Sequence, residues 1–423
     1  MSAATIQVNP VSTNSFANTT FAPNMVSLRQ VLPTIESIAT GTPEHTIRQS
    51  DAAQLVAQLP NLEQNRSLIE KLYHNTRIDT RHLAINLLSK DAIATLNASS
   101  IKDRMRLYQE HAVPLAERVA ERAIAAASAP KVNLPGYTTV DIRSNIRQIV
   151  FVSSTGFVAP GVDAALIERL GLRRDIARVT INFMGCAAAM NGLRVASDYV
   201  RANPTHKSLV VCLELSSINA VFEDDLNDVI IHSIFGDGCA AVVIGACTEA
   251  ECLGQGHVVI RDHLSYLAEN TQDGIALGIQ DSGITCKLSR QLPDYIETGV
   301  GGIIERYLAD HQLTKQDINL WAVHPGGTRI IQKVQRSLDL TDDQVADSWE
   351  VLRQYGNMLS PSVLFVMERM LNRLEQFRYP ESAFHTPIDP GTGWQDTAQQ
   401  SLTGLAFSFS PGVGVEGILF QTL

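Results

Sequence analysis

Cys186 is the first residue of the chain whose type and setting could support nucleophilic chemistry. It stands in Phe-Met-Gly-Cys-Ala-Ala-Ala, where a β-branched run ends, a glycine permits a tight turn and a helical pattern begins. A thiol at the start of a helix meets the positive end of the helix dipole, which lowers its pKa and favours the nucleophilic thiolate. Considered by itself, the same motif also fits a buried structural cysteine.

Histidine and asparagine candidates lie in the second half of the chain. His324 ends an apolar strand pattern and precedes Pro-Gly-Gly, which breaks the strand and lets the backbone approach a ligand closely. A neutral imidazole there could accept a thiol proton or donate to a carbonyl. Asn357, in Tyr-Gly-Asn-Met, could donate two hydrogen bonds into a cavity. Taken singly, His324 also fits a core histidine, and Asn357 fits a cap or turn residue.

The composition indicates a folded protein with a large core. The 423 residues are 45% hydrophobic and 18% charged, and 34 basic against 44 acidic residues give a net charge of −10. That balance argues against nucleic acid as a main partner. No apolar run approaches the ~18 residues of a membrane span. Residues 1–27 lack the basic start and apolar stretch of a secretion signal, so we expect a cytoplasmic protein.

The cysteines and glycines do not indicate a bound metal or nucleotide. No Cys-x-x-Cys pair and no His-Glu-x-x-His motif occurs, so no metal site is expected. Six cysteines are too few for a disulfide scaffold, and Cys239 and Cys247, at the ends of one apolar run, are expected to be buried thiols. Gly412-Val-Gly-Val-Glu-Gly417 matches a dinucleotide fingerprint, but a strand pattern follows where that fingerprint needs a helix.

Strand and helix patterns alternate around these candidates. Strands with nearly all-apolar sequences that alternate with amphipathic helices indicate a buried sheet covered by helices. The helices are predicted at 51–59, 65–73, 101–127, 162–170, 187–201, 294–311, 329–338, 347–355 and 361–376, with Pro114 kinking or dividing the third. The strands are predicted at 148–153, 179–183, 208–213, 240–244, 257–260, 320–324, 403–410 and 413–423, and residues 378–400 are predicted to form a surface loop.

Taken together, the motifs resemble those of the type III polyketide synthases, the chalcone-synthase-like family. Gly-Cys186, Phe235-Gly-Asp-Gly, His324-Pro-Gly-Gly, Gly-Asn357-Met and Phe409-Ser-Pro-Gly occur in the family's order between about residue 41 and the C-terminus. The resemblance implies a thiolase-like αβαβα layered fold in a homodimer. Its two similar halves would be residues 41–250 and 251–423, after a weakly ordered arm of residues 1–40.

The resemblance also implies roles for the residues that match its motifs. Cys186 would carry the acyl chain, with His324 and Asn357 completing the triad. Phe235 matches the aromatic gatekeeper between the CoA tunnel and the cavity, and the Pro411-Gly412 pair matches a C-terminal loop that shapes the cavity.

Further positions fall where the family lines its cavity or binds CoA. Cys286 stands near a second aromatic gatekeeper position, and Ser216 and Asn219 fall among small polar lining residues. Lys71 and Arg329 are the expected contacts to the phosphates of CoA.

The reaction that this resemblance implies is iterative decarboxylative condensation of malonyl-CoA onto an acyl thioester, followed by cyclisation. A cysteine fills less volume than a phenyl ring, so Cys286 favours a medium- or long-chain fatty acyl starter, on CoA or on an acyl carrier protein, and an alkylresorcinol or alkylpyrone product. No metal, nicotinamide or flavin is required. Two alternatives stay open, namely a β-ketoacyl-carrier-protein synthase III-like enzyme that condenses once, and a catalytically inactive thiolase-like interaction partner.

Overall fold

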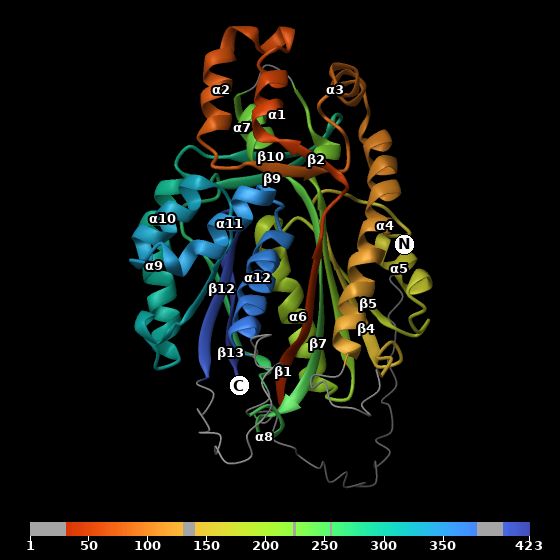
Figure 1. Ribbon diagram of the computed structural model, residues 1–423, viewed down its shortest axis with the longest axis vertical. Coiled ribbons are helices and arrows are strands. Elements are labelled where there is room, and N and C mark those ends of the chain that lie inside the picture. The colour runs from red at the N-terminus through yellow and green to blue at the C-terminus, as the bar shows by residue number, and fades with distance from the viewer. Residues whose placement is uncertain (1–30, 130–139, 223–225, 254–255, 379–400) are drawn as a thin grey trace, which may run out of the picture.

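A large mixed sheet runs through the centre of the protein (Figure 1), seen in a computed structural model that describes residues 31–129, 140–222, 226–253, 256–378 and 401–423. Within these residues the sheet consists of β1 (Val31–Gly41), β4 (Ile146–Val152), β5 (Ala177–Ile181), β6 (Lys207–Leu215), β7 (Asp237–Thr248), β8 (Val258–Leu267), β11 (Leu320–Val323), β12 (Leu402–Ser410) and β13 (Gly414–Thr422). Their order is β11-β12-β13-β8-β1-β7-β6-β4-β5. Because β1 and β8 pair only at Thr34 with Val259 and Ile35 with Val258, the sheet consists of two half-sheets joined at this point.

Helices cover the outer faces of the half-sheets and fill the space between them. They are α1 (Gln49–Val56), α2 (Arg66–His74), α3 (Lys90–Asn97), α4 (Ile101–Ser128), α5 (Val162–Arg169), α6 (Ala188–Ala202), α7 (Leu226–Ile234), α8 (Glu249–Cys252), α9 (Leu292–Asp310), α10 (Thr328–Leu338), α11 (Ala346–Tyr355) and α12 (Pro361–Arg378). One apolar cluster joins α4 and α5 to β4, β6 and β7, a second joins α6 and α12 to strands of both halves, and a third joins α9 and α10 to β11, β12 and β13. This layering confirms the expected αβαβα arrangement of a thiolase-like fold.

A helical cap lies at one end of the molecule, at the top of Figure 1. It contains α1, α2 and α3 and a two-stranded sheet of β2 (His45–Arg48) and β3 (Thr80–Leu83). A second two-stranded sheet, β9 (Ile275–Gln280) with β10 (Gly283–Leu288), lies at the same end, beside α7. The cap has its own apolar cluster, which includes Ile69, Leu83 and Val229 and so ties the cap to α7.

The first strand corrects the predicted N-terminal arm. β1 begins at Val31 and lies inside the sheet between β7 and β8, so the expectation of a weakly ordered arm is wrong for residues 31–40. Pro33, Ser37 and Thr40 interrupt the apolar pattern of this segment, which hid the strand. Residues 1–30 and the predicted loop from residue 379 to residue 400 lie outside the described part of the chain.

Two further expectations are corrected by the structure. Pro114 was expected to kink or divide a helix, and the division does not occur, because Pro114 lies inside α4, which runs undivided from Ile101 to Ser128. Cys247, expected as a free thiol, forms a disulfide with Cys252, because the short helix α8 turns the chain back toward the end of β7. Strands β9 and β10 were not predicted at all, since their residues lack a clear alternation of apolar and polar side chains. No helix in the described ranges is long and apolar enough to cross a membrane.

Candidate active site

Cys186, His324 and Asn357 line one cavity of about 470 Å³. Cys186 lies in a one-turn 3-10 helix, Gly185–Ala187, that leads into α6. His324 follows β11 directly, and Asn357 follows the C-terminal end of α11. Three turns that are distant in sequence therefore meet at one end of the half-sheets, as the glycine-rich motifs predict. A cavity of this size is typical of a small-molecule site.

The turn that carries Cys186 is held from both sides. Gly185 adopts a positive φ of 57°, and a Cβ atom on it would lie 3.4 Å from the Pro411 ring. The Gly185 N–H donates to Ser154 Oγ at 3.1 Å, and Ser408 Oγ donates to the Cys186 carbonyl at 2.8 Å. Glycine is needed here because both the backbone conformation and the close approach of the ring disfavour a side chain.

Burial sets the protonation of the thiol and the imidazole. It raises the pKa of Cys186 well above its ordinary value and lowers the pKa of His324 to about 3. The expectation that the helix dipole lowers the pKa of Cys186 is therefore wrong, because desolvation of a thiolate outweighs the dipole of one short turn. The pair rests as a neutral thiol and a neutral imidazole.

The imidazole of His324 has both ring nitrogens available to hydrogen-bond a ligand. Its side chain is 1% exposed, and neither ring nitrogen has a hydrogen-bond partner among the described residues. A buried polar group without a partner is costly unless a ligand completes it. A neutral imidazole offers one N–H donor and one lone pair, so it can serve both a proton-accepting and a carbonyl-binding role.

Asn357 lies beside the thiol, and backbone groups of neighbouring residues hold its side-chain amide. Its side-chain oxygen and nitrogen lie 3.9 Å and 3.8 Å from Cys186 Sγ. Its Nδ2 also donates to the Gly326 carbonyl at 3.3 Å, and its Oδ1 accepts from the Leu359 N–H at 2.8 Å. The amide orientation is thus set by neighbours, with an N–H directed toward the cavity wall that Cys186 shares.

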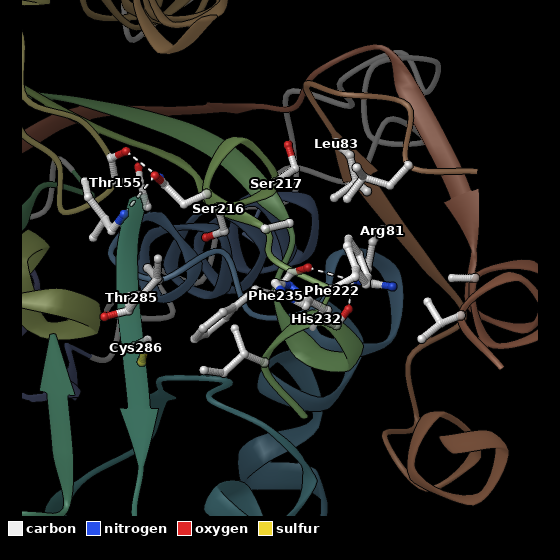
Figure 2. A pocket seen from close by; sticks show the side chains of 18 of the residues that line it. Arg81, Leu83, Thr155, Ser216, Ser217, Phe222, His232, Phe235, Thr285 and Cys286 are labelled. Carbon is white, nitrogen blue, oxygen red and sulfur yellow. Dashed lines mark hydrogen bonds between the residues drawn. The ribbon is translucent and has the colours of Figure 1, made fainter. Parts of the chain in front are cut away.

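A second cavity continues from the first behind Phe235. Figure 2 shows Phe235 and Cys286 in its wall, together with Ser216 and Thr155. The residues that line both cavities are Phe235, Leu277, Cys286 and Leu359. The second cavity is mostly apolar and reaches the cap, where α1 contributes Ala52 and Val56. Its volume is about 70 Å³, so it is a narrow extension of the first cavity and not a second chamber.

The predicted cavity residues Cys286, Ser216 and Asn219 differ in their burial and in their hydrogen-bond partners. Cys286 is partly buried at the boundary, and burial raises its pKa to about 12, so it is a neutral thiol. Ser216 Oγ is buried without a hydrogen-bond partner among the described residues. Asn219 lines the cavity, but its amide is engaged, since Nδ2 donates to the Thr155 carbonyl and Oδ1 accepts from the Ile284 N–H.

The predicted loop residues Pro411 and Gly412 lie behind the catalytic turn. Neither belongs to the lining of the two cavities, whereas Phe409, two residues earlier, lines the first. Pro411 supports Gly185 by contact, and Gly412 N–H donates to the Ile275 carbonyl at 2.9 Å. This segment therefore shapes the cavity through its neighbours.

Three basic residues are candidates for binding CoA at the first cavity: two were predicted from the sequence, and the structure adds a third. Of the two residues expected to contact CoA, Arg329 lines this cavity, while Lys71 lies on α2 next to the lining residue Leu72 and does not line it. Arg290 lines it too and was missed by the sequence reasoning, because a lone arginine between β10 and α9 carries no motif. Within the described residues, none of these three side chains forms an ion pair or a hydrogen bond.

A buried carboxyl group behind the site was also missed. Glu214, at the end of β6, is fully buried and accepts hydrogen bonds from Ser154 N–H, Thr155 Oγ1 and Ser360 Oγ at 2.8–2.9 Å. Burial raises its pKa to about 7. Since Ser154 supports Gly185 and Ser360 follows the Asn357 turn, Glu214 links the supports of two site residues.

In the described residues no group of His, Cys, Asp and Glu could hold a metal ion.

Comparisons with known proteins agree on one group of enzymes. The family profiles for chalcone and stilbene synthases match this chain, the N-terminal domain over residues 25–248 and the C-terminal domain over residues 263–423. The "alpha-pyrone synthesis polyketide synthase-like Pks18" of Mycobacterium tuberculosis is 47% identical over 92% of this chain and 91% of its own length. The 1,3,6,8-tetrahydroxynaphthalene synthase of Streptomyces peucetius subsp. caesius is 29% identical over 92% of each chain. The crystal structure of PKS-I from the brown alga Ectocarpus siliculosus matches with a TM-score of 0.82 and 40% identity, over 93% of this chain and 99% of that chain.

Proposed function

The chain belongs to the chalcone and stilbene synthase family and is a type III polyketide synthase, and from this premise we propose that it extends a fatty acyl starter with malonyl-CoA and cyclises the product to an alkylpyrone or alkylresorcinol. The observation that carries the proposal is the narrow apolar cavity that continues past Cys286 from the cavity of the triad.

Starter loading would use Cys186 and His324. The thiol attacks the carbonyl carbon of the starter thioester while His324 accepts the thiol proton through its free lone pair. The proton then passes to the departing CoA thiolate, and the acyl group remains bonded to Cys186 Sγ. The Cys186 thiol and the His324 imidazole are both neutral before the reaction. This suits the route, because the proton moves only as the carbon–sulfur bond forms.

Extension would use His324 and Asn357 as hydrogen-bond donors. Both N–H groups can meet the thioester oxygen of a bound malonyl group, where negative charge develops as carbon dioxide leaves. The enolate carbon attacks the acyl group on Cys186 and displaces the Cys186 thiolate, which leaves an extended β-ketoacyl-CoA. The Cys186 thiolate then attacks this thioester, CoA thiolate departs, and the extended chain is again bonded to Cys186 for the next round. Since loss of carbon dioxide generates the carbanion, the chemistry requires no metal or redox cofactor.

The second cavity supports a linear starter. An unbranched alkyl chain fits a narrow apolar space better than an aromatic ring does, and each buried methylene contributes up to about 0.8 kcal/mol. The mycobacterial relative is named for alpha-pyrone synthesis, which agrees with a pyrone product. The lining of this cavity is mostly apolar, and its apolar members include Ala52, Val56, Leu83, Leu87 and Ile284.

The cations at the mouth support delivery of the thioester by CoA. Arg290 and Arg329 line the entrance, and both are exposed and unpaired within the described residues. Such arginines can bind the phosphates of CoA, and the same charges suit the phosphopantetheine of an acyl carrier protein. Lys71 lies on α2 outside the cavity lining and would act only on the outer phosphates.

A homodimer is part of the proposal. β5 is an edge strand of the sheet, and three of its five residues are exposed, so it offers unpaired backbone groups to a second copy. Phe157, 41% exposed, packs against Phe183 two residues before Gly185, which brings the same face close to the catalytic turn. Light scattering of the eluting protein would give the mass, and Phe157→Asp is expected to shift it toward a monomer.

The test of the function is product analysis with a starter series. The purified enzyme is incubated with malonyl-CoA and acyl-CoA starters from acetyl to stearoyl, and products are identified by mass spectrometry. Triketide and tetraketide pyrones or resorcinols from the longer starters are expected. A single 3-oxoacyl product would favour the synthase III-like alternative. Absence of products, with no protection of Cys186 by acyl-CoA against iodoacetamide, would favour an inactive interaction partner.

A further inference from the structure

The C-terminal end of α7 is buried and is completed by side chains from the cap. The last carbonyls of a helix have no partner within it, and a buried helix end needs donors from elsewhere. Arg81, on β3, donates through its Nη1 to the carbonyls of His232 and Phe235, the latter at 2.8 Å. Gln49 Nε2 donates to the Ser233 carbonyl at 2.6 Å. Figure 2 shows Arg81 directed toward His232 and Phe235.

Arg81 and Gln49, here called the α7 clamp, also hold each other. Arg81 Nε donates to Gln49 Oε1 at 2.9 Å, and Gln49 Nε2 also donates to Thr76 Oγ1 at 3.0 Å. Both residues are nearly fully buried, with 3% and 5% exposure. A guanidinium at a helix C-terminus also complements the negative end of the helix dipole. The clamp thus supplies both donors and charge where water cannot.

The remaining carbonyl of the helix end is bonded to the triad. Ile234 accepts from the backbone N–H of Asn357 at 2.9 Å, and the Asn357 carbonyl accepts from the Gly236 N–H at 3.0 Å. These two bonds form an isolated bridge between Phe235 and Asn357. A displacement of the α7 end therefore moves the side chain at the boundary of the cavities and the triad amide together.

The strand that carries Arg81 fastens α11 as well. Thr80 Oγ1 donates to the Gln354 carbonyl at 2.7 Å, and Asp79 N–H donates to the Arg353 carbonyl at 2.7 Å. A Cβ atom on Gly356 would lie 2.6 Å from the Ile234 carbonyl oxygen and 3.1 Å from the Arg81 side chain. The turn before Asn357 thus packs directly on the clamp, and no space is left for adjustment.

We propose that Arg81, together with Gln49, is a positioning residue for decarboxylation: by holding the end of α7 it fixes Phe235 and the Asn357 amide relative to Cys186. Arg81 lines the second cavity, and its Nε and Nη1 donate to Gln49 and to the carbonyls of His232 and Phe235, so its role runs through the helix end. Loading of the starter depends on Cys186 and His324, which the clamp does not contact. The inference rests on the proposed function and names the residues that make its decarboxylation step efficient.

The experiment separates the two half-reactions in Arg81→Met. Acylation of Cys186 by a starter acyl-CoA is followed by mass spectrometry of the intact protein, and malonyl-CoA decarboxylation by release of acetyl-CoA. Because a misplacement of about 1 Å can cost about 100-fold in rate, decarboxylation is expected to fall about 100-fold while acylation changes less than threefold. Arg81→Lys, whose single ammonium cannot reach both carbonyls at once, is expected to recover about a tenth of the wild-type rate.

Arg104→Met is the matched control for loss of a buried arginine. Arg104 is fully buried and also donates to backbone carbonyls, but these are the carbonyls of Leu96, Ile218 and Ala220 and not those at the end of α7. The Arg104→Met variant is expected to lower the melting temperature about as much as Arg81→Met does. Its ratio of decarboxylation rate to acylation rate is expected to equal that of the wild type. Parallel losses of both half-reactions in Arg81→Met, or an equal change of the ratio in Arg104→Met, would overturn the inference alone. A wild-type protein that releases no acetyl-CoA from malonyl-CoA would overturn the proposed function and the inference with it.

Discussion

Cys286→Phe is expected to close the passage from the catalytic cavity to the narrow cavity behind it. Cys286 lines both cavities and packs in one cluster with Phe235 and Leu359, so a phenyl ring at this position would fill the boundary between them. The backbone of this position is paired with Leu277 in the β9–β10 sheet, and that pairing does not depend on the side chain. The substitution therefore changes the shape of the cavity while the hairpin is retained.

The size of the effect follows from the methylenes that lose their burial. If the ring excludes about four methylenes of a long starter, the lost transfer free energy is about 3 kcal/mol, at about 0.8 kcal/mol for each. That corresponds to a loss of roughly 100-fold in kcat/KM for the long starter. A starter of two to four carbons does not reach past Cys286 and should be affected less than threefold. The measured quantity is the ratio of kcat/KM for lauroyl-CoA to that for butyryl-CoA.

Lys287→Phe is the control on the same strand. Lys287 is exposed and, as the next residue of β10, points to the opposite face, so it receives the same ring without filling the passage. Its ratio of long to short starters is expected to equal that of the wild type. An unchanged ratio in Cys286→Phe would show that the starter chain does not pass Cys286, and would refute the assignment of the second cavity.

The remaining predictions concern the catalytic turn, the amide and the buried carboxyl group. Cys186→Ala is expected to abolish acylation and product formation with a melting temperature within about 2 °C of the wild type, since the residue is small and partly buried; normal condensation would exclude it as nucleophile. Asn357→Ala is expected to lose malonyl decarboxylation at least tenfold while starter loading, measured by protein mass, is retained; failed loading would make the residue structural. Gly356→Ala is expected to destabilise the fold by about 3 kcal/mol in urea unfolding, because φ is +70° and the new Cβ meets the Ile234 carbonyl at 2.6 Å. Burial raises the pKa of Glu214 to about 7 against about 4.5 in the unfolded chain, so wild-type stability should fall as pH rises between these values. In Glu214→Gln that decline should be smaller by about 3 kcal/mol, and equal melting-temperature changes between pH 5 and pH 7.5 in both proteins would contradict it.

Local sequence patterns predicted the elements whose ends carry the triad. The strand before His324 was expected at 320–324 and lies at Leu320–Val323, and the last two strands were expected within two residues of their observed ends. Such strands can be predicted from apolar runs bounded by glycine and proline. A strand buried on both faces needs continuous apolar residues, and the turn that follows it needs backbone angles that glycine and proline favour. The same reasoning located the turns of Cys186 and Asn357. β1 escaped it, since its neighbours in the sheet and not its own pattern keep Pro33 and Ser37 in a strand.

What the sequence could not reveal are the partners that hold the site residues in place. Arg81 is 154 positions from Phe235, and Glu214 is 146 positions from Ser360, and neither pair has a periodic signature. Each is a buried polar group whose value depends on acceptors that only the tertiary structure brings close. The sequence also misjudged the thiol of Cys186, because the dipole of a helix can be read from a motif but desolvation depends on everything that covers it. Motifs thus locate the groups that react, whereas their protonation and their alignment belong to residues that the motifs do not contain. The α7 clamp is one such case. Separate measurement of starter acylation and malonyl decarboxylation in Arg81→Met tests whether residues outside the motifs align the reacting groups.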